Sequence, residues 1–195
     1  MDQQQIETTL AVTQAMADEL ADYLMGDNLY RQLIVKTPGG VKQPKMTVGA
    51  LLENVQSLEW EQERLSAEQG RQLQAIKDRV AVERGAFAAQ WRTMLRRELK
   101  ALLDSWRWYL DDASRDPDAR ETYGREAHIR TRIDLVQAAL GKDPLSTEQR
   151  RELGELDTRL RAMLHGGAYV GPRGSERRYP PGEAWWLYGQ PAEAE

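Results

Sequence analysis

Apolar side chains recur at alternating spacings of four and three residues along most of the chain, which limits the fold to packed amphipathic helices. The clearest stripe is formed by Ile6, Leu10, Thr13, Ala17, Leu20 and Leu24. Residues at this spacing share one face of an α-helix, and Gly26 follows the stripe as a helix terminator. A first helix is therefore predicted from Ile6 to Leu24.

Two more helices are predicted between Thr47 and Ala113. Thr47 is a suitable N-cap for a second helix, whose stripe is Leu51, Val55, Leu58, Gln62 and Leu65. Ser66 and Gln69 form a capping box at the start of a third helix. Its apolar positions continue to about residue 113, so we expect one long central helix over residues 67–113, about 70 Å in length. Gly85 is its expected kink.

Punctuation residues separate two further helices. Asp116 and Pro117 end the long helix, and a fourth helix is predicted over residues 118–140, stopped by Gly141 and Pro144. A second capping box at Ser146 starts a fifth helix, which Gly166 and Gly167 end. The expected fold is an all-α, elongated bundle of about five amphipathic helices with coiled-coil-like spacing.

Residues 30–47 fit two different structures. The β-prone segment Leu33–Thr37, the turn Pro38–Gly40 and the segment Val41–Thr47 together suggest a small β-hairpin. Pro44 weakens the second strand because it has no backbone N–H to donate. A helix followed by a loop is the alternative, and the sequence leaves both open.

The last residues change character, which divides the chain into a helical domain, 1–165, and a tail, 166–195. Glycine and proline are frequent in this tail, so we expect it to be irregular. It nevertheless carries Trp185, Trp186 and Tyr188, and disordered segments are poor in aromatic residues. Either the tail folds back so that Trp185 or Trp186 packs near Trp108, or these aromatic residues bind a partner: Trp185, Trp186, Tyr188 and Trp108.

Composition removes several classes of protein. The chain contains no cysteine, which excludes disulfides, thiolate nucleophiles and Cys-based metal sites. It has no basic leader ahead of an apolar run and no apolar stretch of about 18 residues, so a cytoplasmic protein without a membrane span is expected. The bias toward arginine, 21 against 6 lysines, is compatible with a GC-rich bacterial genome.

No catalytic constellation is visible. The two histidines, His128 and His165, lie in no metal-binding spacing, and the phosphate-binding and nucleophile motifs of common enzymes are missing. We therefore expect neither catalysis nor a cofactor nor a metal site.

A basic cluster on the long helix is the main electrostatic candidate. Its members share one helix face because they are spaced three to four residues apart: Arg92, Arg96, Arg97 and Lys100. Acidic residues interrupt the surrounding surface and the net charge is −4, so a solvated face is the preferred interpretation and nucleic-acid binding is not expected.

These observations favour a non-enzymatic interaction or scaffold protein, acting through helix packing or through its aromatic tail. A protein partner or self-association is the expected mode. The alternative is a regulatory bundle that binds a small ligand in an apolar pocket lined by Trp91, Trp106 and Tyr109.

Overall fold

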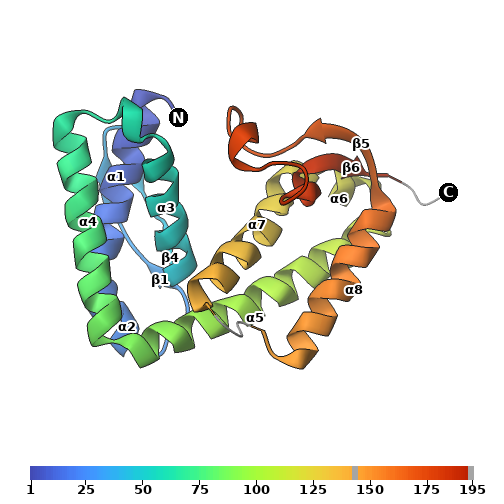
Figure 1. Cartoon of the computed structure of the whole chain (residues 1–195), viewed down its shortest axis with the longest axis horizontal. Helices are drawn as coiled ribbons and strands as arrows, with labels where there is room; N and C mark the ends of the chain where they lie inside the picture. Colours follow the sequence, from blue (N-terminus) through green and yellow to red (C-terminus); the bar gives the residue numbers. More distant parts are fainter. Residues whose placement is uncertain (142–144, 193–195) are drawn as a thin grey trace. The chain divides into compact units, whose positions relative to one another are not determined.

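The computed structural model describes residues 1–141 and 145–192 of the chain (Figure 1). These residues form two compact units, Met1–Glu98 and Leu99–Glu195. The predicted all-α class with a small hairpin is confirmed, because helices dominate both units and the strands are short. Each unit has its own buried core and is described by itself.

The first unit contains four helices, a short 3-10 turn, four very short strands and the beginning of a fifth helix. In chain order they are α1 (Gln3–Asp18), α2 (Leu20–Met25), β1 (Arg31–Gln32), β2 (Val35–Thr37), β3 (Gly40–Lys42), β4 (Lys45–Met46), α3 (Val48–Trp60), η1 (Gln62–Arg64), α4 (Ala67–Ala86) and α5 (Ala88–Ala113). The helix α1 packs against both α3 and α4.

The predicted stripe of the first helix forms part of the core of this unit. Its members are all buried: Ile6, Leu10, Thr13, Ala17, Leu20 and Leu24. Thr13 is tolerated there because its hydroxyl donates a 2.5 Å hydrogen bond to the backbone oxygen of Thr9. The helix is nevertheless divided at Glu19, where α1 ends and α2 begins.

The hairpin alternative for residues 30–47 is the one that forms. Strand β2 pairs antiparallel with β3, and β1 pairs antiparallel with β4. Thr37 closes the turn by donating from its hydroxyl to the oxygen of Gly40 at 2.7 Å, and Gly40 has a φ of +100°, which favours glycine. Thr47 then caps α3 by accepting from the amide of Ala50, as predicted.

The predicted single helix over residues 67–113 is wrong in one respect, since it is two helices. The chain leaves helical geometry at Phe87, with φ −115° and ψ 41°, between α4 and α5. Gly85, the expected kink, lies inside α4. The low helix propensity of Gly85 predicted a break two residues from the observed one. A propensity difference of about 1 kcal/mol does not fix the exact position of a break, because tertiary context overrides it.

The second unit contains the remainder of α5 and the elements that follow it. These are α6 (Pro117–Glu121), α7 (Tyr123–Leu140), α8 (Thr147–Met163), β5 (Leu164–Tyr169), η2 (Glu176–Arg178), η3 (Trp185–Leu187) and β6 (Tyr188–Pro191). The predicted fourth helix is divided at Thr122, and Gly141 ends α7 with a φ of +75°. Pro144, the second predicted stop, lies outside the described residues.

The C-terminal tail is more regular than its glycine and proline content suggests. Helix α8 ends at Met163, not at Gly166–Gly167, and the chain continues directly into β5. Strand β5 pairs antiparallel with β6 through an irregular stretch between His165 and Tyr169. Gly166 lies in that stretch with a φ of +81°. Glycine adopts this positive φ without strain, which suits a bulge in the ribbon.

None of the described helices is both long enough and apolar enough to cross a lipid bilayer.

Candidate interaction groove between α5 and α8

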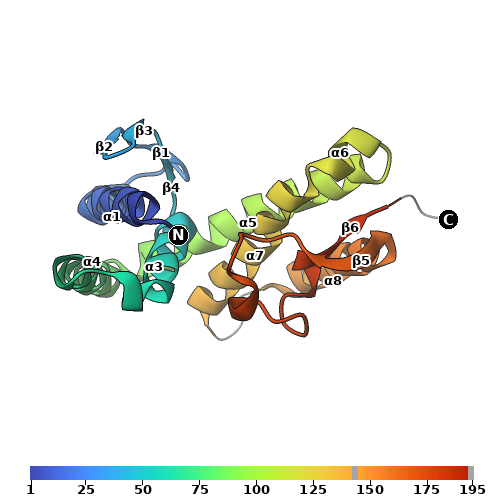
Figure 2. The same ribbon diagram turned by 90° about the horizontal axis from the view of Figure 1, so that it is seen from above.

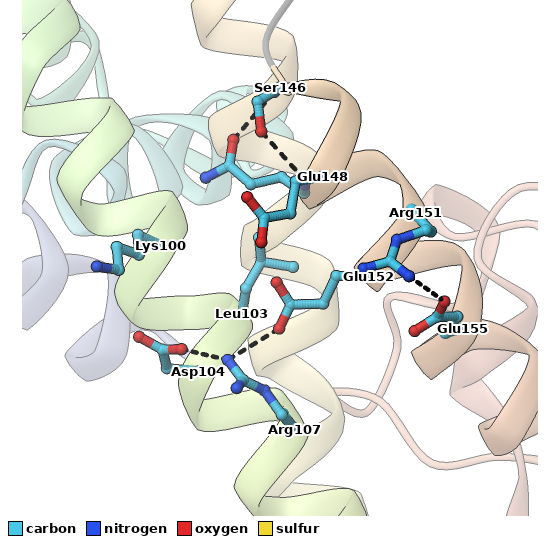
Figure 3. Close-up of a pocket in the computed structure, with 10 residues that line it drawn as sticks. Lys100, Leu103, Asp104, Arg107, Ser146, Glu148, Arg151, Glu152 and Glu155 are labelled. Atoms are coloured by element: carbon cyan, nitrogen blue, oxygen red, sulfur yellow. Dashed lines mark hydrogen bonds and ion pairs between the residues drawn. The ribbon is translucent and has the colours of Figure 1, made fainter.

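An open groove of about 820 Å³ lies between α5 and α8 in the second unit (Figure 3). One wall is the α5 face that carries Lys100, Asp104 and Arg107. The other wall is the first half of α8, with Ser146, Glu148, Gln149, Arg151, Glu152 and Glu155. Leu103, which is 1% exposed, lies at its floor. The groove is thus charged along both walls and apolar at its base.

Helical periodicity places these side chains on the two facing walls. Lys100, Asp104 and Arg107 are spaced four and three residues apart and therefore share a face of α5. The capping box at Ser146 fixes where α8 begins: its Oγ accepts from the amide of Gln149 at 3.2 Å, and the Gln149 side chain accepts from the Ser146 amide at 3.1 Å.

Beyond the groove, Arg159 of α8 connects this helix to the end of α5. Its guanidinium donates to the backbone oxygen of Leu110 and to the hydroxyl of Ser114, both at 2.9 Å, and it pairs with Asp111. These contacts hold the second half of α8 against α5. The first half lies further from α5 in the ribbon view, so the groove opens toward the N-terminus of α8 (Figure 1).

Ion pairs cross and line the groove without burying charge. Arg107 of α5 pairs with Glu152 of α8 at 2.8 Å and with its neighbour Asp104. Arg151 pairs with Glu155 at 3.5 Å. Because Arg107 is 46% exposed and Glu152 is 27% exposed, such pairs contribute about 0–1 kcal/mol each. An incoming charged side chain can therefore exchange with them at little cost.

The aromatic residues proposed for the tail lie inside the second unit. Trp186 is 3% exposed; its indole Nε1 donates to the Thr131 hydroxyl at 3.0 Å, and its backbone oxygen accepts from the Tyr123 hydroxyl. Trp185 stacks under the guanidinium of Arg161, whose Cζ lies 3.9 Å from the ring centroid. The tail rings thus contact α7 and α8.

Tyr188 and Trp108, the other two predicted partner-binding residues, have different surroundings. The Tyr188 hydroxyl donates to the backbone oxygen of Tyr179 at 2.8 Å. Trp108 is 71% exposed, and the tail tryptophans stack on Arg130 and Arg161 and not on Trp108. The hypothesis that a tail tryptophan packs near Trp108 is therefore wrong, whereas partner binding by these residues stays a prediction.

The predicted basic cluster lies on α5 and is exposed along its length. Arg92, Arg96 and Arg97 are exposed on the part of α5 that belongs to the first unit. Lys100 belongs to the second unit, where it lines the groove. The structure therefore connects one member of the predicted cluster with the groove.

The aromatic residues of the alternative ligand pocket are core residues. Trp91 belongs to the first unit and is 2% exposed, with the guanidinium of Arg84 over its ring at 5.9 Å. Trp106 is fully buried in the second unit and stacks on Tyr109 at 5.5 Å. Burial raises the pKa of the Tyr109 hydroxyl. The groove is lined by other residues, so a ligand pocket at these aromatics stays a prediction.

Among residues 1–141 and 145–192, no group of three or more histidine, cysteine, aspartate or glutamate side chains is arranged to hold a metal ion. His128 and His165 are both exposed. The groove has the composition of a polar recognition surface, with both signs of charge and an apolar floor.

Sequence reasoning did not single out the α8 wall of the groove. The signal available was a charged stripe at the start of a capped helix, formed by Glu148, Glu152 and Glu155. Only the fold shows that this stripe is one wall of a groove, because α8 faces the stripe on α5.

No family model matches the sequence, and no curated protein or solved structure is significantly similar to it.

Proposed function

We propose that the chain is a non-enzymatic interaction protein that binds a helical segment of a protein partner in the groove between α5 and α8. The observation that carries the proposal is Trp108, whose side chain is 71% exposed on α5. It follows Asp104 by four residues, so it lies one helical turn further along beside the groove-lining face. Tryptophan is the residue most enriched among energetically dominant interface positions.

The groove supplies the other elements of a helix-binding surface. Two nearly facing helices with an apolar floor accept a third helix, whose side chains fill the space between them. The walls offer charges of both signs, which select the register and orientation of the bound segment. The tail is a weaker route, since the rings of Trp185 and Trp186 already contact arginines of this chain.

Site-specific photocrosslinking tests the proposal. A benzophenone amino acid is placed at Trp108 in the full chain, and in a matched chain at Gln90, an exposed position on the same helix but in the first unit. Irradiation in the native host should give a discrete protein adduct from position 108 and none from position 90. Mass spectrometry identifies the adduct and distinguishes a second copy of this chain from another protein.

A charge reversal in the groove completes the test. Glu152→Lys replaces the Arg107 ion pair with repulsion across the groove and should abolish the adduct formed at position 108. Glu121→Lys, an exposed change on α6, should leave it intact. Equal crosslinking from positions 108 and 90, or an adduct that persists in Glu152→Lys, would contradict binding in the groove.

A further inference from the structure

The hairpin of the first unit is a single ribbon with one constant register. Arg31 pairs with Met46, Gln32 with Lys45, Val35 with Lys42 and Lys36 with Val41, so that Ile34 lies opposite Gln43. The ladder is interrupted at Pro44, which has no N–H, yet the Leu33 amide still donates to the Pro44 oxygen at 3.0 Å.

One face of this ribbon is fixed to the unit. Side chains alternate between the two faces of a strand, and the inner set includes Leu33, Val35 and Met46, which are at most 8% exposed. Strand β2 contacts α1, and the ribbon covers that helix (Figure 2). The ribbon is thus held rigidly with its other face outward.

The outer face consists of three cross-strand pairs that are all exposed. They are Gln32 with Lys45, Ile34 with Gln43, and Lys36 with Val41. Ile34 is 76% exposed and Val41 is 60% exposed, although aliphatic side chains of this size are normally covered. This outer face therefore combines lysines, side-chain amides and two uncovered aliphatic groups.

The charge of the ribbon is opposite to that of its surroundings. Residues 28–47 contain Arg31, Lys36, Lys42 and Lys45 and no acidic residue. The rest of the first unit carries 8 basic and 14 acidic residues. Arg31 pairs with Glu19, whereas the three lysines form no ion pair with any described residue. A local positive potential thus lies on a unit that is otherwise negative.

We propose that the outer face of this ribbon binds duplex DNA by entering the major groove. The major groove is wide enough for a two-stranded antiparallel ribbon. Lysine ammonium groups neutralise phosphates or donate to guanine, glutamine amides pair with adenine, and aliphatic side chains contact the thymine methyl group. Each of these chemical types is present on the three pairs.

The same residues fit other macromolecules less well. Protein interfaces are depleted in lysine, which two of the three pairs contain. They are enriched in arginine and aromatic residues, and the three pairs contain neither. Single-stranded nucleic acid needs aromatic side chains on which bases stack, and these pairs offer none. The expectation against nucleic acid followed from the charge of the whole chain and of α5, and this ribbon differs from both in composition.

Fluorescence anisotropy with a labelled 20-base-pair duplex of mixed sequence tests the proposal on the full chain. Two phosphate contacts, one from each lysine of the outer face, predict a slope of about −1.8 in log affinity against log salt, equivalent to an affinity loss of about 12-fold between 50 and 200 mM salt. Lys36→Glu with Lys45→Glu should abolish this slope and weaken binding at 50 mM salt. Arg71→Glu, a matched reversal at an exposed position of α4, should leave both unchanged.

Backbone amide chemical shifts locate the contact. Titration of the duplex into the wild type should move the amide signals of residues 32–45. The Lys36→Glu/Lys45→Glu variant should have the circular dichroism spectrum of the wild type, so that its weaker binding is not caused by misfolding. No binding at 50 mM salt, equal weakening by Arg71→Glu, or stronger binding to phosphatidylserine vesicles or polyglutamate than to the duplex would each overturn the proposal.

Discussion

The guanidinium of Arg130 lies over the indole ring of Trp186, with its Cζ 4.3 Å from the ring centroid. Arg130 belongs to α7 and is only 7% exposed. Its Nε and Nη2 donate to the carboxylate of Asp157 in α8 at 2.8 and 2.9 Å, and its Nη1 donates to Asp134. A tail residue and two helices therefore share one buried cation. This arrangement makes the tail part of the second unit.

Truncating Trp186 should destabilise the second unit strongly. Trp186→Ala removes a nearly buried indole, its hydrogen bond to Thr131 and its stacking on Arg130, so we expect a loss of about 3–5 kcal/mol in the free energy of unfolding. Trp108→Ala, at an exposed tryptophan, should change it by less than about 0.5 kcal/mol. Urea unfolding followed by circular dichroism measures both, and similar values would show that the tail does not stabilise the unit.

The two carboxylates around Arg130 should differ in their importance. Asp157 is 13% exposed and forms a bidentate pair, so Asp157→Ala leaves a buried cation without its main partner and should cost about 3 kcal/mol. Asp134 is 48% exposed, and Asp134→Ala should cost less than about 1 kcal/mol. Thermal unfolding of the two variants compares them directly. Equal effects would mean that Asp134 carries as much of the pairing as Asp157.

Local features of the fold follow from the sequence because they depend on neighbouring residues. The capping boxes at Ser66 and Ser146 locate two helix starts, since the serine and the glutamine three residues later satisfy each other's backbone amides. The stripe from Ile6 to Leu24 is buried for the same reason, as one helix face must be covered.

Features that depend on residues far apart in the chain could not be predicted from the sequence. Asp157 and Arg130 read as ordinary surface charges on separate helices until the fold places them beside Trp186. The hairpin at residues 30–47 was one of two structures that the sequence left open, because its strands contain only two or three residues each, too few for a periodic signal. The groove requires knowing that Arg107 faces Glu152, 45 residues further along the chain.

Removing a capping serine should have a small, defined effect. Ser146→Ala deletes the acceptor for the Gln149 amide at the start of α8 and should lower the free energy of unfolding by about 1 kcal/mol. Ser105→Ala, in the exposed interior of α5, should be neutral or slightly stabilising because alanine is the better helix former. Chemical denaturation of both variants provides the comparison, and equal losses would contradict a specific capping role.

Glu98 should make the stability of the first unit dependent on pH. Its carboxylate is 2% exposed and accepts from the Thr47 hydroxyl at 2.6 Å and from the Gly49 amide at 2.7 Å. Burial raises the pKa of the Glu98 carboxyl above its usual value of 4.5, although these two hydrogen bonds oppose the rise. The folded state therefore binds a proton that the unfolded state has already released.

The sign of the pH dependence follows from that difference in proton binding. The stabilising contribution of protonated Glu98 is fully present below pH 4.5 and is lost as the pH rises through the raised pKa, at up to about 1.4 kcal/mol per pH unit. Glu98→Gln cannot titrate, so its free energy of unfolding should fall less steeply over this interval than that of the wild type. Glu63→Gln, at an exposed position of η1, is the control and should retain the wild-type slope. Urea unfolding at successive pH values measures these slopes, and identical slopes for Glu98→Gln and the wild type would exclude Glu98 as the titrating group.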